Sequence, residues 1–286
     1  MADLSLLLVA VVWGATFVMV KDAVTLAGPL TFVGLRFALA AAVLLPLAAT
    51  RIGPSPLPLL GGLVAGVFLF AGYALQTAGL QFTSASKAGF ITGLAVVIVP
   101  VLTTLIDRRL PPAATALGVL LATAGLALLS LADALSVQAG DLLVLGCAVA
   151  FALHILVVGH AAPGSDVVGL TFAQIMAAAL LTVPSAFLFE RPAGAQLLAV
   201  LPAALFTGVF ATVVAFYLQT RAQRFTTPTH TALIFTMEPV FAGLFGFLLA
   251  GERLGPRALV GCALILAGML VAQLVPEKRS VHEPFG

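Results

Sequence analysis

The sequence predicts an all-α polytopic membrane protein, with ten transmembrane helices arranged as two inverted five-helix repeats. Three observations support this prediction: an apolar composition, ten long apolar runs and an internal duplication. Of the 286 residues, 62% are hydrophobic and 8% are charged, and the mean hydropathy is +1.19. A soluble domain has about 25% charged residues and could not bury so much apolar mass. The composition therefore excludes a soluble enzyme, a disordered protein and a nucleic-acid-binding protein.

Ten apolar runs along the chain are each long enough to cross a bilayer. A helix needs about 20 apolar residues to span a hydrocarbon core of roughly 30 Å. Proline, glycine and charged residues separate the runs at short breaks, and the period-2 alternation of a membrane β-barrel is absent. We number the predicted spans first to tenth: residues 4–21, 30–49, 57–80, 86–106, 112–131, 139–159, 167–189, 197–220, 229–250 and 256–275.

An internal duplication relates the two halves of the chain. The motif Tyr73-Ala-Leu-Gln76-Thr77 resembles Phe216-Tyr-Leu-Gln219-Thr220, half a chain length later. Chance similarity between Leu-rich and Ala-rich helices is the alternative, but the matches include Gln, Thr and Gly in one register across three helices. We therefore predict a first repeat over residues 1–137, a second over 138–276 and a polar tail over 277–286.

Each half contains five spans, and an odd number places the second half upside down in the membrane. Such an inverted repeat places a site between the halves, near the midplane, with alternating access from the two sides. Channels can also be built from inverted repeats, so the duplication alone does not separate a carrier from a channel. Seven loop Lys and Arg residues lie on the side of the N-terminus and five on the other side, which predicts that both termini are cytoplasmic.

Glycines at matching positions of the fifth and tenth spans predict close helix packing. Each pair is seven residues apart and lies on one helix face, so we expect the pairs to pack against each other or in a dimer. The four residues are Gly118, Gly125, Gly261 and Gly268. Small-xxx-small pairs in the third and fourth spans also permit close approach: Gly62/Gly66 and Gly89/Gly93.

Ionisable residues inside the spans need a reason, because a charge at the bilayer centre costs at least ~2.5 kcal/mol. Glu238 is the deepest, and Pro239 after it disturbs the helix. Its carboxylate either binds an ammonium group or a proton, or is satisfied by a neighbouring helix. His154 is either a ligand donor that titrates near neutral pH or a hydrogen-bonded packing residue. Arg36 can snorkel outward or pair with an acid, and we expect such a structural role for it in preference to contact with the substrate.

Two cations occupy matching positions at helix starts. Lys87 begins the fourth span and His230 the ninth. Helix N-termini attract anions, so a carboxylate-bearing substrate could be steered there. Ordinary capping by Ser86 and Thr229 beside an exposed cation is the alternative.

A polar stripe follows the third span and recurs in the eighth. Tyr73, Gln76 and Thr77 share one helix face. The corresponding turn of the eighth span contains Tyr217, Gln219 and Thr220. Trp13, the only tryptophan, lies mid-span with Thr16 on the same face, away from the interface where Trp is usual. These side chains either line a wet cavity or hold helices together.

Catalytic and metal-binding motifs are absent from the sequence. HExxH, GxSxG and P-loop patterns do not occur. Cys147 and Cys262 lie in separate apolar runs without metal-ligand spacing. We therefore expect a protein that is not an enzyme and that has no metal, cofactor or nucleic-acid partner.

Several motifs resemble the EamA-like branch of the drug/metabolite transporter superfamily over nearly the whole chain. The motifs are Trp13-Gly14-Ala15-Thr16-Phe17, Arg36-Phe37, the segment Ala232–Ala242 with Glu238-Pro239, and Gly251-Glu252-Arg253-Leu254. The resemblance implies a ten-helix exporter of the bacterial inner membrane, with cytoplasmic termini and a central cavity lined chiefly by the first, third, fourth, sixth, eighth and ninth helices. The chain departs from a symmetric pattern, because Ala95-Val96 stands where the second repeat has Glu238-Pro239.

The sequence and the resemblance together predict a secondary transporter that exports small metabolites, most of all amino acids, including aromatic ones. The alternatives are a multidrug exporter of lipophilic or quaternary cations and an uncoupled channel or uniporter. Expected partners are a small-molecule substrate, membrane lipid and, in a weaker hypothesis, protons coupled through Glu238 and His154; the protein would be a monomer or a homodimer. The candidate substrate-binding residues are Trp13, Thr16, Tyr73, Gln76, Thr77, Lys87, His154, Tyr217, Thr220, His230 and Glu238.

Overall fold

The protein is built from helices that match the predicted apolar runs. The computed structural model describes residues 1–51, 57–83, 85–108, 110–130, 138–250 and 255–273, and no strand occurs in these ranges. Seven helical spans in this part are long and apolar enough to cross a membrane, and three shorter apolar helices cover the first, fifth and tenth predicted spans. The elements are α1 (Ala2–Ala27), α2 (Pro29–Ala49), α3 (Leu57–Leu80), α4 (Ala85–Gly93), α5 (Ala95–Asp107), α6 (Ala113–Ser130), α7 (Ala139–Ala161), α8 (Val167–Phe189), α9 (Gly194–Gly208), the π-helix η1 (Val209–Val214), α10 (Ala215–Ala222), α11 (Pro228–Phe235), α12 (Met237–Ala250) and α13 (Pro256–Gln273).

The turn between α1 and α2 is set by glycine, proline and a distant carboxylate. Gly28 has φ 79°, a conformation that glycine adopts without steric cost. Pro29 begins α2, where its missing N–H costs no hydrogen bond. Two free N–H groups of the first turn, those of Leu30 and Thr31, donate to the Glu190 carboxylate at 2.9 and 2.7 Å. Glu190 thus connects the end of α8 to the start of α2.

The fourth and ninth spans are both broken, at matching points of the two halves to within one residue. We predicted continuous spans, but α4 ends before Leu94 and α11 ends before Thr236. In the ninth span the cause is Pro239, which cannot donate to the Phe235 carbonyl. The Thr236 hydroxyl donates to the Leu233 carbonyl at 2.6 Å and stabilises the break. No proline stands at the break in the fourth span, where Gly93, a poor helix former, is the last residue of α4.

The eighth span contains a π-helix that the sequence did not predict. It runs as α9, η1 and α10 without interruption. In η1 the backbone forms wide turns, with hydrogen bonds from residue i to i−5, and such segments are rare and frequent at functional sites. The Thr212 hydroxyl also donates to a carbonyl five residues back, that of Thr207, at 3.1 Å.

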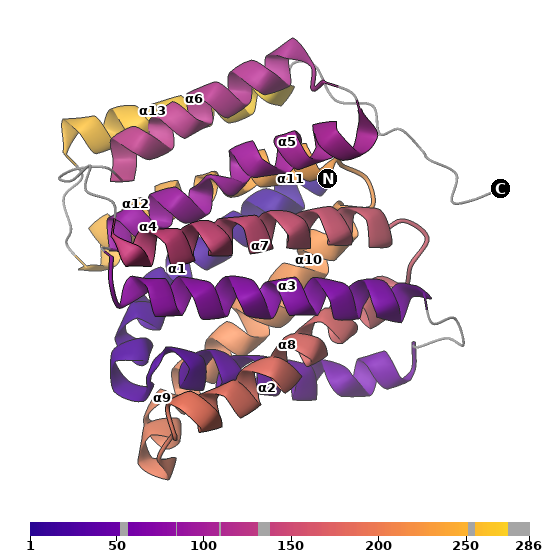
Figure 1. The fold of residues 1–286 in the computed structure, drawn as a ribbon, viewed down its shortest axis with the longest axis vertical. Helices are drawn as coiled ribbons and strands as arrows, with labels where there is room; N and C mark the ends of the chain where they lie inside the picture. Colours follow the sequence, from indigo (N-terminus) through magenta and orange to yellow (C-terminus); the bar gives the residue numbers. More distant parts are fainter. Residues whose placement is uncertain (52–56, 84, 109, 131–137, 251–254, 274–286) are drawn as a thin grey trace.

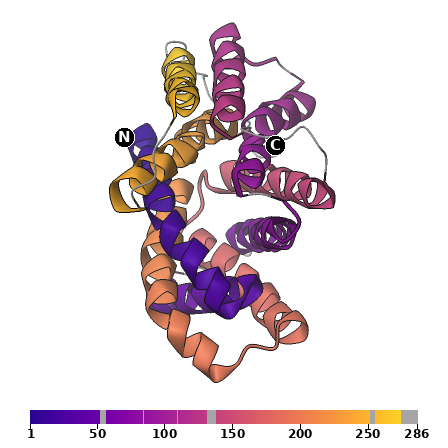
Figure 2. The same cartoon turned by 90° about the vertical axis from the view of Figure 1, so that its left-hand side faces the viewer.

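The glycine pairs of the fifth and tenth spans pack against each other, which is the first of the two expected arrangements. Figures 1 and 2 both show α6 and α13 side by side at one end of the molecule. A Cβ atom on Gly125 would lie 2.5 Å from the Gly261 carbonyl oxygen, and one on Gly118 would lie 2.6 Å from that of Gly268. Only glycine allows the two backbones to come this close.

The other small-residue pairs divide between packing and open space. Gly62 and Gly66 of α3 approach α8, because a Cβ on Gly66 would lie 2.5 Å from the Gln174 carbonyl oxygen. Gly93 lies against Leu126, but a Cβ on Gly89 would meet nothing within 4 Å. The prediction that Gly89 supports close helix packing was therefore wrong.

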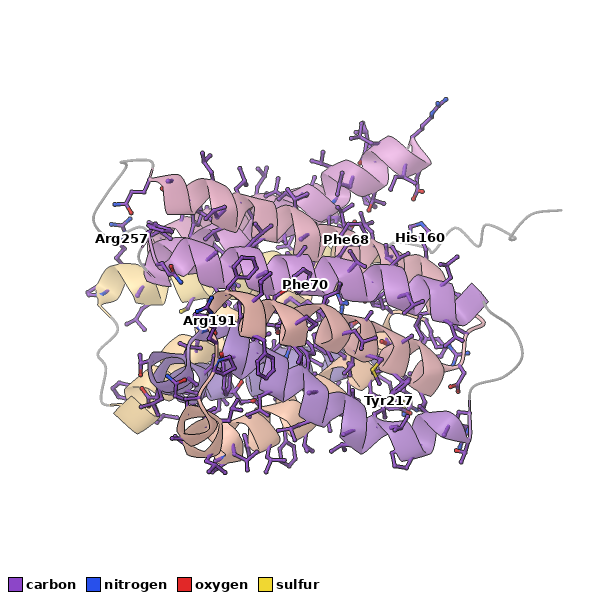
Figure 3. The ribbon with its side chains drawn as sticks, turned by 60° about the horizontal axis from the view of Figure 1, so that its bottom comes forward. Phe68, Phe70, His160, Arg191, Tyr217 and Arg257 are labelled. Carbon is purple, nitrogen blue, oxygen red and sulfur yellow. The ribbon has the colours of Figure 1, made fainter. Side chains whose placement is uncertain are left out.

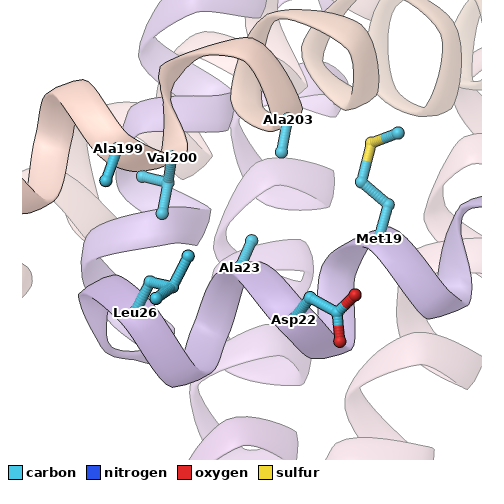
Figure 4. Close-up of a pocket in the computed structure, with 7 residues that line it drawn as sticks. All are labelled: Met19, Asp22, Ala23, Leu26, Ala199, Val200 and Ala203. Carbon is cyan, nitrogen blue, oxygen red and sulfur yellow. The ribbon is translucent and has the colours of Figure 1, made fainter.

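A pocket of about 160 Å³ lies between α1 and α9, away from the predicted site residues. Figure 4 shows its α1 side chains opposite those of α9. Asp22 is the charged residue among those that line it. The lining residues are Met19, Asp22, Ala23, Leu26, Ala199, Val200 and Ala203.

The α6–α13 contact predicts a sharp difference between two Gly→Ala substitutions. Gly125→Ala should destabilise the protein by about 1–3 kcal/mol, because its Cβ meets backbone atoms that cannot move independently. Gly89→Ala should be neutral, or stabilising by up to about 1 kcal/mol, because the new methyl has room and alanine favours the helix. Thermal unfolding of both variants in the same detergent measures the difference, and equal stability would contradict the packing described here.

Candidate functional site

One backbone carbonyl in η1 accepts hydrogen bonds from two buried polar side chains. Trp13 Nε1 of α1 donates to the Ala211 oxygen at 2.9 Å. Arg36 Nη2 of α2 donates to the same oxygen at 2.9 Å. Arg36 Nε also donates to the Thr212 hydroxyl at 2.6 Å. The π-helix therefore connects the first, second and eighth spans through polar contacts inside an apolar bundle.

Arg36 is buried, with 4% of its surface exposed. It neither snorkels outward nor forms an ion pair with a described carboxylate, which corrects both of the expected arrangements. Its Nη2 lies 3.3 Å from the Tyr73 hydroxyl, and its guanidinium carbon is 5.4 Å from the Tyr73 ring centre. A guanidinium at this distance from a ring face has a favourable cation–π interaction. Arg36 therefore orients both η1 and Tyr73.

Aromatic rings surround this polar centre from four other helices. Trp13 lies 5.7 Å from the ring of Phe216 and 5.0 Å from that of Phe235. Tyr73 makes edge-on contacts at 5.4 Å with both Phe37 and Phe151. Tilted and edge-on ring pairs at these distances stabilise the packing. Trp13 and Tyr73 are both half-buried, so each keeps a surface that a ligand could contact.

Glu238 is a half-buried carboxylate without a hydrogen-bond donor in the described part of the chain. It lies in the first turn of α12, directly after the break at Thr236. Its backbone lies against α1, because a Cβ on Gly14 would come within 2.9 Å of the Glu238 carbonyl oxygen. The Arg36 charge acts on its carboxylate through space, but no ion pair of 4 Å or less joins these two described residues. One of the two alternatives for Glu238 was that a neighbouring helix supplies a hydrogen-bond donor to its carboxylate. The described residues do not show this arrangement.

A second polar group lies on α3, α4 and α7. The Gln76 amide nitrogen donates to the Thr92 hydroxyl at 3.2 Å, and this hydroxyl lies 3.8 Å from the Cys147 sulfur. Cys147 and Tyr73 both lie within electrostatic range of Glu238, and Tyr73 is hydrogen-bonded to Arg36. The structure therefore places Trp13, Tyr73, Gln76 and Glu238 in one region of the bundle.

His154 belongs to a buried chain of hydrogen bonds. Its Nε2 lies 2.7 Å from the Gln174 side-chain oxygen, and the Gln174 nitrogen donates to the Thr220 hydroxyl at 3.1 Å. The His154 ring also contacts Phe216 edge-on at 5.7 Å. All three polar side chains are buried. This arrangement corresponds to the alternative in which His154 is a hydrogen-bonded packing residue. It also gives the Thr220 hydroxyl a hydrogen-bond partner.

Three other predicted residues lie near this centre without offering it a described polar contact. The hydroxyls of Thr16 and Thr77 donate to carbonyls of their own helices. Tyr217, labelled in Figure 3, packs against the cluster formed mainly by α2 and α8, which Trp13 and Tyr73 also contact and to which Phe216 belongs.

The two predicted cations at helix starts have different outcomes. His230 Nε2 lies 3.2 Å from the Asp3 carboxylate near the start of α1. Asp3 precedes Trp13 by ten residues, or about 15 Å of helix. The cap of α11 is Thr227, which accepts from the His230 N–H, and not Thr229 as expected. Lys87 lies in α4, but its side chain is outside the described residues.

Several residues of the centre were missed from the sequence. Phe216 could have been found, because the register of the duplication pairs it with Tyr73, whereas we chose its neighbour Tyr217 as the aromatic residue of this turn. Gln174 is an intramembrane amide of the kind that predicts helix contacts. Thr212 and the Ala211 carbonyl became visible only with the π-helix.

Chemically, the centre can bind but has no evident means of catalysis. Among the described residues, no group of three or more His, Cys, Asp and Glu side chains could hold a metal ion. The groups that keep unused binding capacity among the described residues are one carboxylate, one amide, one nitrogen of the Arg36 guanidinium and several aromatic surfaces. Such a set fits a small molecule with an apolar part and a positive charge.

The buried His154–Gln174–Thr220 chain generates a prediction on stability. Gln174→Leu should lower the free energy of unfolding by about 1–3 kcal/mol, because two buried polar groups lose their partner. The double variant His154→Leu/Gln174→Leu should recover part of this loss, because one unpaired group is removed. Thermal unfolding in detergent is the measurement, and a Gln174→Leu protein as stable as the wild type would contradict the role of this chain.

The chain is similar to known membrane transport proteins over almost its whole length. The model of the EamA-like transporter family matches residues 1–131 and 138–273. An uncharacterized transporter of Archaeoglobus fulgidus is 35% identical over 273 residues, which are 96% of this chain and 86% of that protein. The uncharacterized transporter YwfM of Bacillus subtilis is 26% identical over 218 residues, 71% of each chain. A solved structure, described only as "Crystal structure of protein", has a similar fold, with a TM-score of 0.79 at 21% identity over 96% of both chains.

Proposed function

The chain belongs to the EamA-like transporter family, and from this premise we propose that it exports small metabolites, principally amino acids and among them aromatic ones, across the bacterial inner membrane. The family makes it a multi-pass membrane transporter for a small molecule, not an enzyme. The observation that carries the proposal is the unpaired Glu238 carboxylate among aromatic rings at the centre of the bundle.

The chemistry of this centre supports an amino-containing substrate. Burying a carboxylate without a partner is costly, so a ligand that supplies an ammonium group gains a strong charge-assisted hydrogen bond. Trp13 and Phe235 offer ring surfaces for the apolar part of the ligand. The Gln76 amide oxygen accepts no hydrogen bond from a described residue, so it can take part in a second hydrogen bond to the ligand.

Alternating access by two inverted halves is the mechanism we propose, with repeats at residues 1–137 and 138–276. The matching breaks at Leu94 and Thr236 support it, because discontinuous helices near the midplane are typical binding elements of inverted-repeat transporters. In this arrangement both termini are cytoplasmic. Glu238 is also our candidate for a proton-coupling group, since it is the intramembrane acid without a donor among the described residues.

Export of lipophilic or quaternary cations is a second candidate function. It is favoured by the same observation, because one free carboxylate among aromatic rings suits a cation that has no carboxylate of its own. The two functions differ in whether a ligand must have an ammonium group that donates hydrogen bonds.

Transport in proteoliposomes tests the proposed function. We expect labelled phenylalanine to exchange against internal phenylalanine, and we expect Glu238→Gln to reduce this exchange at least about tenfold, as loss of a charged hydrogen bond predicts. Asp22→Asn, which removes an exposed acid from the α1–α9 pocket, is the matched control and should transport normally.

Other outcomes favour the rival functions. Strong competition by tetraphenylphosphonium, lost in Glu238→Gln, without any exchange of phenylalanine, would identify a cation exporter. Flux far above carrier rates, without stimulation by substrate on the opposite side, would identify a channel.

A further inference from the structure

Two opposite charges lie near each other at the centre of the bundle without forming an ion pair. Arg36 and Glu238 interact electrostatically, yet no contact of 4 Å or less joins these described residues. Buried charges are stable only when each is paired and hydrogen-bonded. The protein itself gives Arg36 neutral acceptors and gives the Glu238 carboxylate no donor among the described residues.

One end of the Arg36 guanidinium is unused. Nε donates to Thr212, and Nη2 donates to Ala211 and Tyr73. Nη1 donates to no described residue, and it is not among the sealed side-chain atoms that have no partner. Nη1 is therefore not completely enclosed, within a side chain that is 4% exposed, and both of its N–H groups lack an acceptor among the described residues. A guanidinium edge with free N–H groups is the preferred partner of a carboxylate.

The two free groups face the same region. Trp13 and Arg36 meet at the Ala211 oxygen, and the residue after Trp13, Gly14, lies against the backbone of Glu238. Tyr73 is hydrogen-bonded to Arg36 and lies within electrostatic range of Glu238. The first route reaches the Glu238 backbone and the second its side chain, so the guanidinium and the carboxylate lie in the same part of the bundle.

We propose that Arg36 binds the carboxylate and Glu238 the ammonium group of one zwitterionic α-amino acid. The inference rests on the proposed function and specifies which end of the substrate each residue recognises. The ligand places its two charges on one α-carbon, so a single molecule gives both buried charges a partner. An amine satisfies Glu238 alone and an acid satisfies Arg36 alone, and each leaves the other charge unmatched.

The surroundings of the two charges favour this orientation. The Thr212 hydroxyl and the Ala211 carbonyl accept one hydrogen bond each from Arg36, and the Tyr73 hydroxyl accepts a third, so that Nη1 is held in place before a ligand arrives. The ring surfaces of Trp13 and Phe235 lie on the side of Glu238 and can receive an apolar side chain.

A ligand series on the wild-type protein tests the inference directly. We would measure inhibition of labelled phenylalanine exchange in proteoliposomes by four compounds: phenylalanine, phenylalanine amide, phenethylamine and N-acetylphenylalanine. The amide and the amine lack the carboxylate, and the N-acetyl compound lacks the ammonium group. All three should bind at least about tenfold more weakly than phenylalanine, as loss of a charged contact predicts.

Two variants assign the ends of the ligand. Glu238→Gln should weaken the binding of phenylalanine but leave the weak binding of N-acetylphenylalanine unchanged. Arg36→Gln should weaken the binding of phenylalanine but leave the binding of phenylalanine amide unchanged. Arg36 also holds η1, so Arg36→Gln could disturb the fold, and Arg36→Lys is the second variant. Lysine keeps the positive charge but lacks the planar guanidinium that can donate two hydrogen bonds to one carboxylate. This variant should therefore reduce the preference for phenylalanine over its amide.

The outcomes separate this inference from the proposed function. If phenylalanine is exchanged and its amide binds equally well in the wild type, the pairing with Arg36 is wrong while amino-acid transport stands. If Arg36→Lys and the wild type discriminate equally between phenylalanine and its amide, Arg36 does not read the carboxylate. If no amino acid is exchanged, the proposed function fails and the inference fails with it.

Discussion

The Ala211 carbonyl, which accepts hydrogen bonds from Trp13 and Arg36, is the contact on which the centre of the protein depends. Without water in a bilayer, each buried polar group must find a partner in the protein. The wide turns of η1 provide the acceptors for both side chains, and the Thr212 hydroxyl beside them adds a third. One irregular segment therefore positions the aromatic surface of α1, the guanidinium of α2 and, through it, Tyr73 of α3.

The polar residues of the bundle fall into two groups with different consequences. His154, Gln174 and Thr220 satisfy each other and are fully enclosed, so they hold α7, α8 and α10 together. Glu238 and Nη1 of Arg36 remain open, and in an apolar interior an open charge is costly unless a ligand completes it. If the proposed site is correct, stability and recognition are carried by separate sets of side chains.

The fold was largely predictable, because lipid exposure imposes apolar runs and the breaks between them contain glycine and proline. Glu238 was predictable as well, since an intramembrane acid is costly enough to be noticed in any sequence. The π-helix was not, because no proline or glycine marks residues 209–214 and its acceptors are backbone atoms. At Leu94 the local signal is a single glycine, Gly93, and the duplication pairs this position with the region of Glu238-Pro239. The role of Arg36 depended on Thr212 and Ala211, which lie more than half the chain away in sequence and could be paired with it only in three dimensions.

The fluorescence of Trp13, the only tryptophan, tests most directly whether the polar centre is the substrate site. The protein in nanodiscs would be titrated with a transported amino acid that does not fluoresce, and then with acrylamide as a quencher. Our account predicts a saturable change in Trp13 emission and slower quenching when the substrate is bound, because the ligand covers the half-buried indole. A transported substrate that leaves both the emission and the quenching of Trp13 unchanged at saturation would contradict it.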